Sequence, residues 1–97
     1  MTVVWLQQAF ADLDSIVAYL LERNPQAAVD MYEAIRQQVG KLAEFPLSGR
    51  PGRVAGTREV VIAGLPYIVP YYIKGREVRI LAVLHTSRKW PEEFDLS

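Results

Sequence analysis

The chain has 97 residues, no cysteine and a formal net charge of zero. This length predicts one small domain, residues 1–97, with a modest core. The lack of cysteine excludes disulfides and thiolate metal sites and fits a reducing compartment. The first residues lack the basic and apolar regions of a signal peptide, and no apolar run reaches membrane-spanning length. We therefore expect a cytoplasmic protein without a membrane partner.

The neutral total conceals a segregation of charge along the chain. Residues 1–48 carry three basic and six acidic side chains, and the last seven residues add three acidic ones. Residues 49–90 carry eight basic against two acidic side chains, for a net charge of +6. Such a basic block indicates a polyanion or an acidic partner, and the alternative interpretation is an ordinary solvated surface.

The first half of the chain predicts two helices after a short opening strand at 3–6. From position 8 onward, apolar residues recur at helical spacing. In the first helix these are Leu13, Ile16, Val17 and Leu20. Asn24 is a favourable N-cap and Pro25 suits a first helical turn, so a second helix should begin there and continue to about Glu44. Two helices joined by so few residues form an antiparallel hairpin.

The second half predicts a loop followed by three strands. Glycines and prolines between 46 and 56 indicate the loop, which carries Arg50 and Arg53. Strands are expected at 58–63, 67–73 and 76–85, with turns at 64–66 and 74–75. Strand alternation in 76–85 places Arg79 and His85 together on the face away from the core. The residues expected on the core face are Val78, Ile80, Ala82 and Leu84.

Pro70 lies in the middle strand, where a proline removes a ladder hydrogen bond, so we expect a bulge or an unpaired position there. The order β-α-α-β-β-β predicts an α+β fold. In it the N-terminal helical hairpin packs on one face of a largely antiparallel four-stranded sheet. The other face stays partly uncovered, and such a face can hold a ligand or the apolar segment of a partner.

Several motifs follow one another along the chain. They are Pro-x-x-Gly-Arg at 46–50, Gly-Thr-Arg-Glu at 56–59, Pro-Tyr-Ile-Val at 66–69, Val-Leu-His at 83–85 and Arg-x-Trp-Pro at 88–91. The pattern resembles the RelE/ParE superfamily of toxins from type II toxin-antitoxin modules, over nearly the whole chain. The resemblance implies a cognate antitoxin and a toxin-antitoxin hetero-oligomer. It also implies one of two activities, because RelE-like members cleave mRNA in the ribosomal A site whereas ParE-like members poison DNA gyrase.

RNA cleavage needs a group that takes the 2′-hydroxyl proton and positive charge around the phosphate. Histidine is the side chain that titrates near neutrality, and His85 is the single histidine. We therefore expect Arg58, His85 and Arg88 to be catalytic if the chain is an mRNA endoribonuclease, with the arginines supplying charge. The alternative interpretation of His85 is a residue that closes the last strand by a hydrogen bond to the backbone.

Five further residues are candidates for binding RNA or a partner: Arg50, Arg53, Arg79, Lys89 and Trp90. The two arginines of the loop suit phosphate contacts or are plain solvated charges. The tryptophan can stack on a nucleobase or pack the C-terminal tail onto the sheet. A single histidine with scattered carboxylates gives no metal-ligand spacing, and no phosphate-binding glycine motif occurs, so we expect no cofactor.

Some positions depart from the ribonuclease pattern. RelE-like nucleases carry alternating lysines on the strand that here reads Glu-Val-Val-Ile at 59–62, and an arginine where this chain has Ile68. The motifs at 56–59 and 85–91, by contrast, resemble the RelE branch. We expect ribosome-dependent mRNA cleavage, with gyrase inhibition as the alternative. A binding module that only titrates an antitoxin is a third hypothesis.

Overall fold

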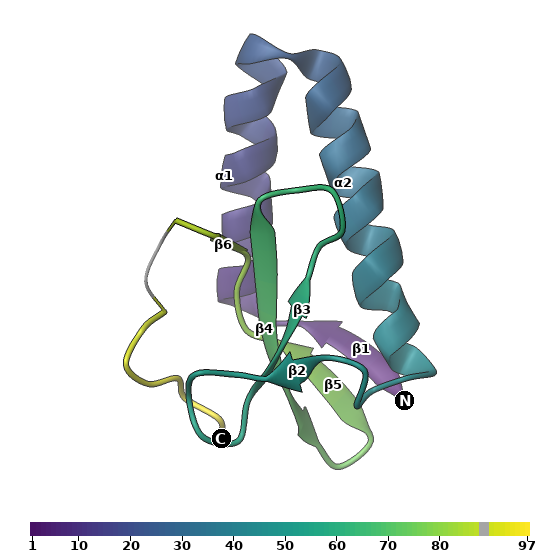
Figure 1. Ribbon diagram of the computed structural model, residues 1–97, viewed down its shortest axis with the longest axis vertical. Coiled ribbons are helices and arrows are strands. Elements are labelled where there is room, and N and C mark those ends of the chain that lie inside the picture. The colour runs from purple at the N-terminus through teal and green to yellow at the C-terminus, as the bar shows by residue number, and fades with distance from the viewer. Residues whose placement is uncertain (88–89) are drawn as a thin grey trace.

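The computed structural model describes residues 1–87 and 90–97, and its main feature is a helical hairpin packed on one face of a sheet (Figure 1). The helices are α1 (Gln7–Arg23) and α2 (Pro25–Gly40), followed by a 3₁₀ turn, η1 (Lys41–Ala43). The strands are β1 (Thr2–Trp5), β2 (Arg50–Pro51), β3 (Arg58–Val61), β4 (Tyr67–Lys74), β5 (Glu77–Ile80) and β6 (Leu84–His85). The predicted α+β class is confirmed.

The hairpin forms where the sequence predicts it. The Asn24 side chain accepts a hydrogen bond from the Ala27 N–H at 3.1 Å, and Pro25 opens α2, so one helix ends where the next begins. The inner faces of both helices pack against one face of the sheet. This core includes Leu13, Met31, Ile35, Val39, Val69, Tyr71, Val78 and Ile80. In the described part of the chain, neither helix has the length and apolar character that crossing a membrane requires.

The sheet is larger than the four strands expected. Within the described residues its order is β1-β5-β4-β3-β2, and β6 pairs with the other end of β4. The β1–β5 pair is parallel and the remaining pairs are antiparallel. The short β2 lies inside the predicted loop, because Arg50 and Pro51 pair with Glu59 and Arg58 of β3.

The strand predicted at 76–85 is interrupted opposite Pro70. Tyr71 pairs with Ile80 and Ile68 pairs with Leu84, so two residues of β4 face the three residues 81–83. The Leu81 N–H donates to the Pro70 carbonyl at 2.9 Å, but proline has no N–H with which to return the bond. The expected irregularity is present, and the extra residue lies in the neighbouring segment as a β-bulge.

The bulge changes which residues face the core. Val78 and Ile80 lie in the core cluster as predicted, and Val83 joins them there. Ala82 is buried but outside that cluster, and Leu84 is only partly buried. A single inserted residue reverses strand alternation for everything that follows it. The prediction for the second half of this strand is therefore wrong by one residue.

The same reversal separates two candidate site residues. His85 pairs with Tyr67, which packs against the core on the helix side of the sheet. Arg79 pairs with Tyr72 on the opposite side. The prediction that Arg79 and His85 share one face is wrong, because the bulge between them was not included in the alternation.

Helix α1 holds the bulge in place, since Asp12 Oδ2 accepts a hydrogen bond from the N–H of the buried Val83 at 3.0 Å. We predict that Asp12→Ala lowers the free energy of unfolding by about 1–3 kcal/mol, because a buried N–H loses its partner. Urea denaturation measures the change. Asp12→Asn retains an acceptor and should lose less.

Asp14→Ala is the matched control, because Asp14 is exposed on the same helix. It should stay within about 0.5 kcal/mol of the parent chain. Equal losses for Asp12→Ala and Asp14→Ala would show that the Asp12–Val83 bond does not stabilise the bulge.

Candidate functional site

The structure separates the residues expected to form one catalytic site. In the ladder Arg58 pairs with Tyr71 and His85 pairs with Tyr67, on either side of β4. Four residues of strand span roughly 13 Å, so the two side chains leave the sheet far apart. The third predicted catalytic residue, Arg88, and the candidate binding residue Lys89 lie outside the described residues.

Arg58 binds the loop that precedes β2. Its Nη1 donates to the carbonyl oxygen of Gly49 at 2.8 Å and to that of Leu47 at 3.3 Å. The Tyr71 hydroxyl donates to the Pro46 carbonyl at 2.7 Å and accepts from the Gly49 N–H at 3.0 Å. Burial raises the pKa of Tyr71, against smaller lowering effects of the Gly49 bond and the Arg58 charge. Arg58 and Tyr71 together tie residues 46–49 to the sheet.

The glycine of the Pro-x-x-Gly-Arg motif is explained by this tie. A Cβ at position 49 would lie 2.5 Å from the Tyr71 hydroxyl and 2.8 Å from the Glu59 carbonyl oxygen. No side chain fits so close an approach, so the motif places a bare backbone N–H against the tyrosine. The motif is thus a structural feature of the loop.

The two loop arginines differ in what they bind. Arg50 Nε pairs with Oε1 of Glu59, whose side chain is only 5% exposed. A buried carboxylate requires such a partner, so the Arg50 charge is already balanced. Arg53 is exposed, and among the described residues it forms no ion pair. Of these two arginines, Arg53 is the one positioned to meet an external anion.

His85 lines a cavity of about 590 Å³ between α1 and the end of the sheet. Its ring lies edge-on to Tyr67, with the centroids 5.5 Å apart. The Ser87 backbone N–H donates to Nδ1 at 3.1 Å, and the Ser87 hydroxyl lies 2.8 Å from the same nitrogen. Because Nδ1 accepts the backbone bond, the proton of the neutral ring lies on Nε2. The remaining nitrogen is therefore a hydrogen-bond donor.

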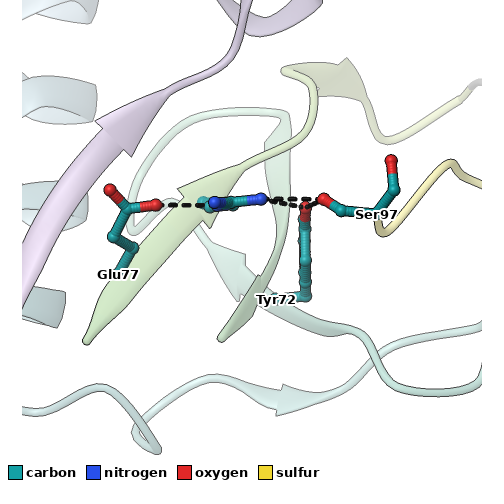
Figure 2. A network of polar contacts seen from close by, with 4 residues as sticks. Tyr72, Glu77 and Ser97 are labelled. Atoms are coloured by element: carbon teal, nitrogen blue, oxygen red, sulfur yellow. Dashed lines mark hydrogen bonds and ion pairs between the residues drawn. The ribbon is translucent and has the colours of Figure 1, made fainter. Parts of the chain in front are cut away.

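On the opposite face, Arg79 binds the last residue of the chain (Figure 2). Its Nε donates to Glu77 at 2.8 Å, and its Nη1 donates to the Ser97 backbone oxygen at 2.8 Å and to the Tyr72 hydroxyl at 3.2 Å. The Tyr72 hydroxyl donates in turn to the Ser97 oxygen at 3.2 Å. The hydrogen bonds to Tyr72 and Glu77 raise the pKa of Arg79, so the cation is permanent.

Trp90 packs the tail onto the same part of the molecule. It is 8% exposed, and it contacts Phe94 edge to face with the ring centroids 5.9 Å apart. A Cβ on Gly52 would lie 2.8 Å from the Trp90 ring, so the ring sits directly on the loop backbone. A ring covered in this way is not open for stacking on a nucleobase. Residues 90–97 thus occupy the sheet face that was expected to be partly uncovered.

Two contacts of these sites were not predicted from the sequence. Ser87 follows His85 by two residues, and a serine hydroxyl at that spacing from a histidine is a local signal that sequence reading can find. The partnership of Tyr72 with Ser97 spans 25 positions, and no local pattern indicates it. Within the described residues, no group of three histidine or acidic side chains is placed to hold a metal ion.

We predict that Arg58→Ala lowers the free energy of unfolding by about 1.5–3 kcal/mol, because its charge-assisted bonds to two loop carbonyls are lost. Arg58→Lys should recover only part, since one ammonium cannot reproduce the geometry of the guanidinium. Thermal or urea denaturation gives the comparison. The control is Arg53→Ala, an exposed arginine in the loop after β2, expected to change stability by less than about 0.5 kcal/mol. If the Arg58→Ala chain were as stable as this control, Arg58 would not stabilise the attachment of residues 46–49 to the sheet.

Comparison with known proteins places this architecture in a family. A family model described as "ParE toxin of type II toxin-antitoxin system, parDE" matches residues 3–90. A relative from Sinorhizobium fredii (strain NBRC 101917 / NGR234), named "Putative toxin Y4kP", is 47% identical over 88 residues, which cover 91% of each chain. The solved "Chromosomal ParDE TA system from P. aeruginosa" contains a chain with a TM-score of 0.79 and 31% identity. That match covers 88% of this chain and 95% of the other. The resemblance to the RelE/ParE superfamily is confirmed, and the chain belongs to the ParE toxin family of type II toxin-antitoxin systems.

Proposed function

We propose that this toxin arrests growth by inhibiting DNA gyrase and has no hydrolytic site of its own. The observation that carries the proposal is that Arg58 and His85 lie on either side of β4, opposite residues Tyr71 and Tyr67, which are four positions apart along the strand. RNA cleavage requires a proton acceptor and a cation at one phosphate. The match to a ParE family model supports the same target, because ParE-like members poison gyrase.

The state of His85 also argues against a general base. A base must present an unprotonated nitrogen to the proton that it removes. In this ring Nδ1 already accepts from the Ser87 backbone, and Nε2 carries the proton. His85 would have to break its backbone bond before it could accept a proton.

The partners follow from the family and from the charge distribution. A ParD-type antitoxin is the proposed neutralising partner, in a toxin-antitoxin hetero-oligomer, because the similar solved structure is that of a ParDE system. The proposed compartment is the cytoplasm, where gyrase acts. Lys74, Arg76 and Arg53 are exposed near the turns that follow β4 and β2, so they offer positive charge to an acidic protein surface.

Ribosome-dependent mRNA cleavage is the second candidate, and the cavity beside His85 is the observation that favours it. The cavity is also lined by Ser15, Tyr19 and Tyr67, which bring hydroxyl groups near the imidazole. The Nε2–H can donate a hydrogen bond to a phosphate or leaving oxygen, and transfer of its proton requires the imidazolium, in which Nδ1 is protonated and no longer accepts from Ser87. This candidate requires its cationic groups to come from residues other than Arg58.

We predict that controlled expression of the toxin changes plasmid supercoiling while leaving translated messages intact. Inhibition of gyrase removes the activity that introduces negative supercoils, so relaxed or cleaved DNA should accompany growth arrest. Gel analysis of plasmid topology and mapping of mRNA 5′ ends report the two outcomes in one culture. New 5′ ends in translated messages with normal supercoiling would overturn the proposal in favour of the nuclease. Growth without arrest, with antitoxin still bound, would favour a module that only titrates the antitoxin.

We predict that His85→Ala leaves growth arrest unchanged, because gyrase inhibition requires no proton transfer. If the chain instead cleaves mRNA with His85 as acid or base, cleavage should fall by about 10²–10⁴-fold. Thr86→Ala is the matched control, since Thr86 is an exposed neighbour in the same segment. Loss of arrest in the folded His85→Ala chain, with arrest retained in the control, would contradict the gyrase proposal.

A further inference from the structure

The C-terminal tail, residues 90–97, is bound to the sheet as a separate ligand would be. At one end the Trp90 ring lies against Gly52, and at the other end Leu96 lies against Gly56, where an added Cβ would come within 3.4 Å. Between them Phe94 contacts Trp90 and is partly buried. The tail therefore has its own binding groove, formed by the loop after β2 and by the helix-free face of β4 and β5.

The far end of this groove is a clamp for one oxygen atom. Arg79 Nη1 and the Tyr72 hydroxyl both donate to the Ser97 backbone oxygen, at 2.8 and 3.2 Å. Glu77 fixes the guanidinium from the other side, as Figure 2 shows. The Asp95 carboxylate accepts from the Ser97 N–H at 3.0 Å and so turns the last residue toward the clamp. Two donors converging on one oxygen suit a carbonyl or carboxylate oxygen of any peptide.

The tail leaves some buried polar atoms in and around the groove without hydrogen-bond partners. Among the described residues, two buried side-chain polar atoms have no hydrogen-bond partner, Trp90 Nε1 and Glu59 Oε2. Trp90 belongs to the tail, and Glu59 shares its face of the sheet with Thr57, beside which the Trp90 ring lies. Each unpaired buried group weakens the seating of the tail. A segment that paired Glu59 Oε2 and left no buried donor of its own without a partner would bind the groove better than the tail does.

The charges indicate which kind of segment that is. The tail itself combines aromatic and apolar residues with three carboxylates, at positions 92, 93 and 95, and it follows a block with a net charge of +6. The pKa of Asp95 is lowered by its hydrogen bonds to Ser97 and, less strongly, by the Lys74 charge. A nucleic acid has phosphates but no apolar side chains for the places of Trp90, Phe94 and Leu96. An acidic peptide has apolar side chains and also carries negative charge, as carboxylates.

We propose that residues 90–97 are a displaceable self-ligand, and that their groove docks an extended acidic segment of a partner protein. The segment carries an aromatic residue in the place of Trp90 and presents an oxygen to Arg79 and Tyr72. The tail then competes with the partner for the same groove. This inference is independent of whether the toxin acts on gyrase or on mRNA, so the two can fail separately.

The test uses the full chain and a labelled eight-residue peptide of the tail sequence, Trp-Pro-Glu-Glu-Phe-Asp-Leu-Ser. Fluorescence anisotropy measures its affinity for the parent chain and for Phe94→Ala/Leu96→Ala, which weakens the tail without touching the groove. The double variant should bind the peptide at least about tenfold more tightly, or ~1.4 kcal/mol. Adding Arg79→Ala should remove this gain. A scrambled peptide of the same composition should bind no more tightly to the variant than to the parent.

Phe45→Ala/Leu47→Ala is the matched control, because it truncates the same residue types at exposed positions away from the groove. It should bind the peptide as the parent does. An equal gain in this control, no gain in the tail variant, or a gain that survives Arg79→Ala would overturn the proposal. The proposal would also be overturned if a single-stranded oligonucleotide with the same net charge as the peptide displaced the labelled peptide. The groove would then be a nucleic-acid site.

A second measurement needs no variant and remains decisive if the tail variant fails to fold. The chain has two tryptophans, Trp5 in β1 and Trp90 in the tail, so fluorotryptophan labelling gives two fluorine resonances. Excess unlabelled peptide should move the Trp90 resonance toward its solvent-exposed position and leave that of Trp5 in place. Two unmoved resonances at saturating peptide would show that the tail is not displaceable.

Discussion

The missing N–H of Pro70 is the constraint on which the arrangement of this sheet depends. Pro70 lies in β4, the central strand of the order β1-β5-β4-β3-β2, and its carbonyl accepts from Leu81 without a reciprocal bond. The neighbouring segment responds with one extra residue between β5 and β6. An irregularity of this kind costs ladder hydrogen bonds, and here the Asp12 carboxylate of α1 supplies one of them to Val83. The helical hairpin thus stabilises the sheet through a polar contact as well as through the core.

The bulge decides which residues can act together. It turns His85 toward α1 and leaves Arg79 on the helix-free face, so one strand segment contributes to two separate sites. On the helix side the imidazole meets the hydroxyl-lined cavity. On the other side the guanidinium meets the tail. Neither site brings a base, a cation and a leaving-group donor together among the described residues.

The sequence predicted what depends on short-range patterns. Helical periodicity and the Asn24-Pro25 pair located the hairpin, and Pro70 located the irregularity in the sheet. The sequence could not predict which face of the sheet His85 lies on. Strand alternation alone does not show whether an irregularity opposite Pro70 adds a residue to the neighbouring segment. The sequence also could not predict β2, a two-residue strand in which Arg50 pairs with the buried Glu59 across the ladder. Contacts such as that of Tyr72 with Ser97 depend on how segments distant in the sequence pack together, and no local sequence pattern predicts this packing.

The basic block of residues 49–90 has a different meaning once these contacts are known. Arg50 is paired with Glu59, Arg58 is bound to loop carbonyls, and Arg79 is held between Glu77 and the tail. Much of the excess positive charge therefore holds the protein's own backbone and carboxylates in place. Affinity for a nucleic-acid backbone grows with the number of phosphates that free cations neutralise, and cations already paired contribute little. A few exposed charges beside an apolar groove favour recognition of an acidic protein surface, where shape and apolar contacts supply the affinity and charge supplies the orientation.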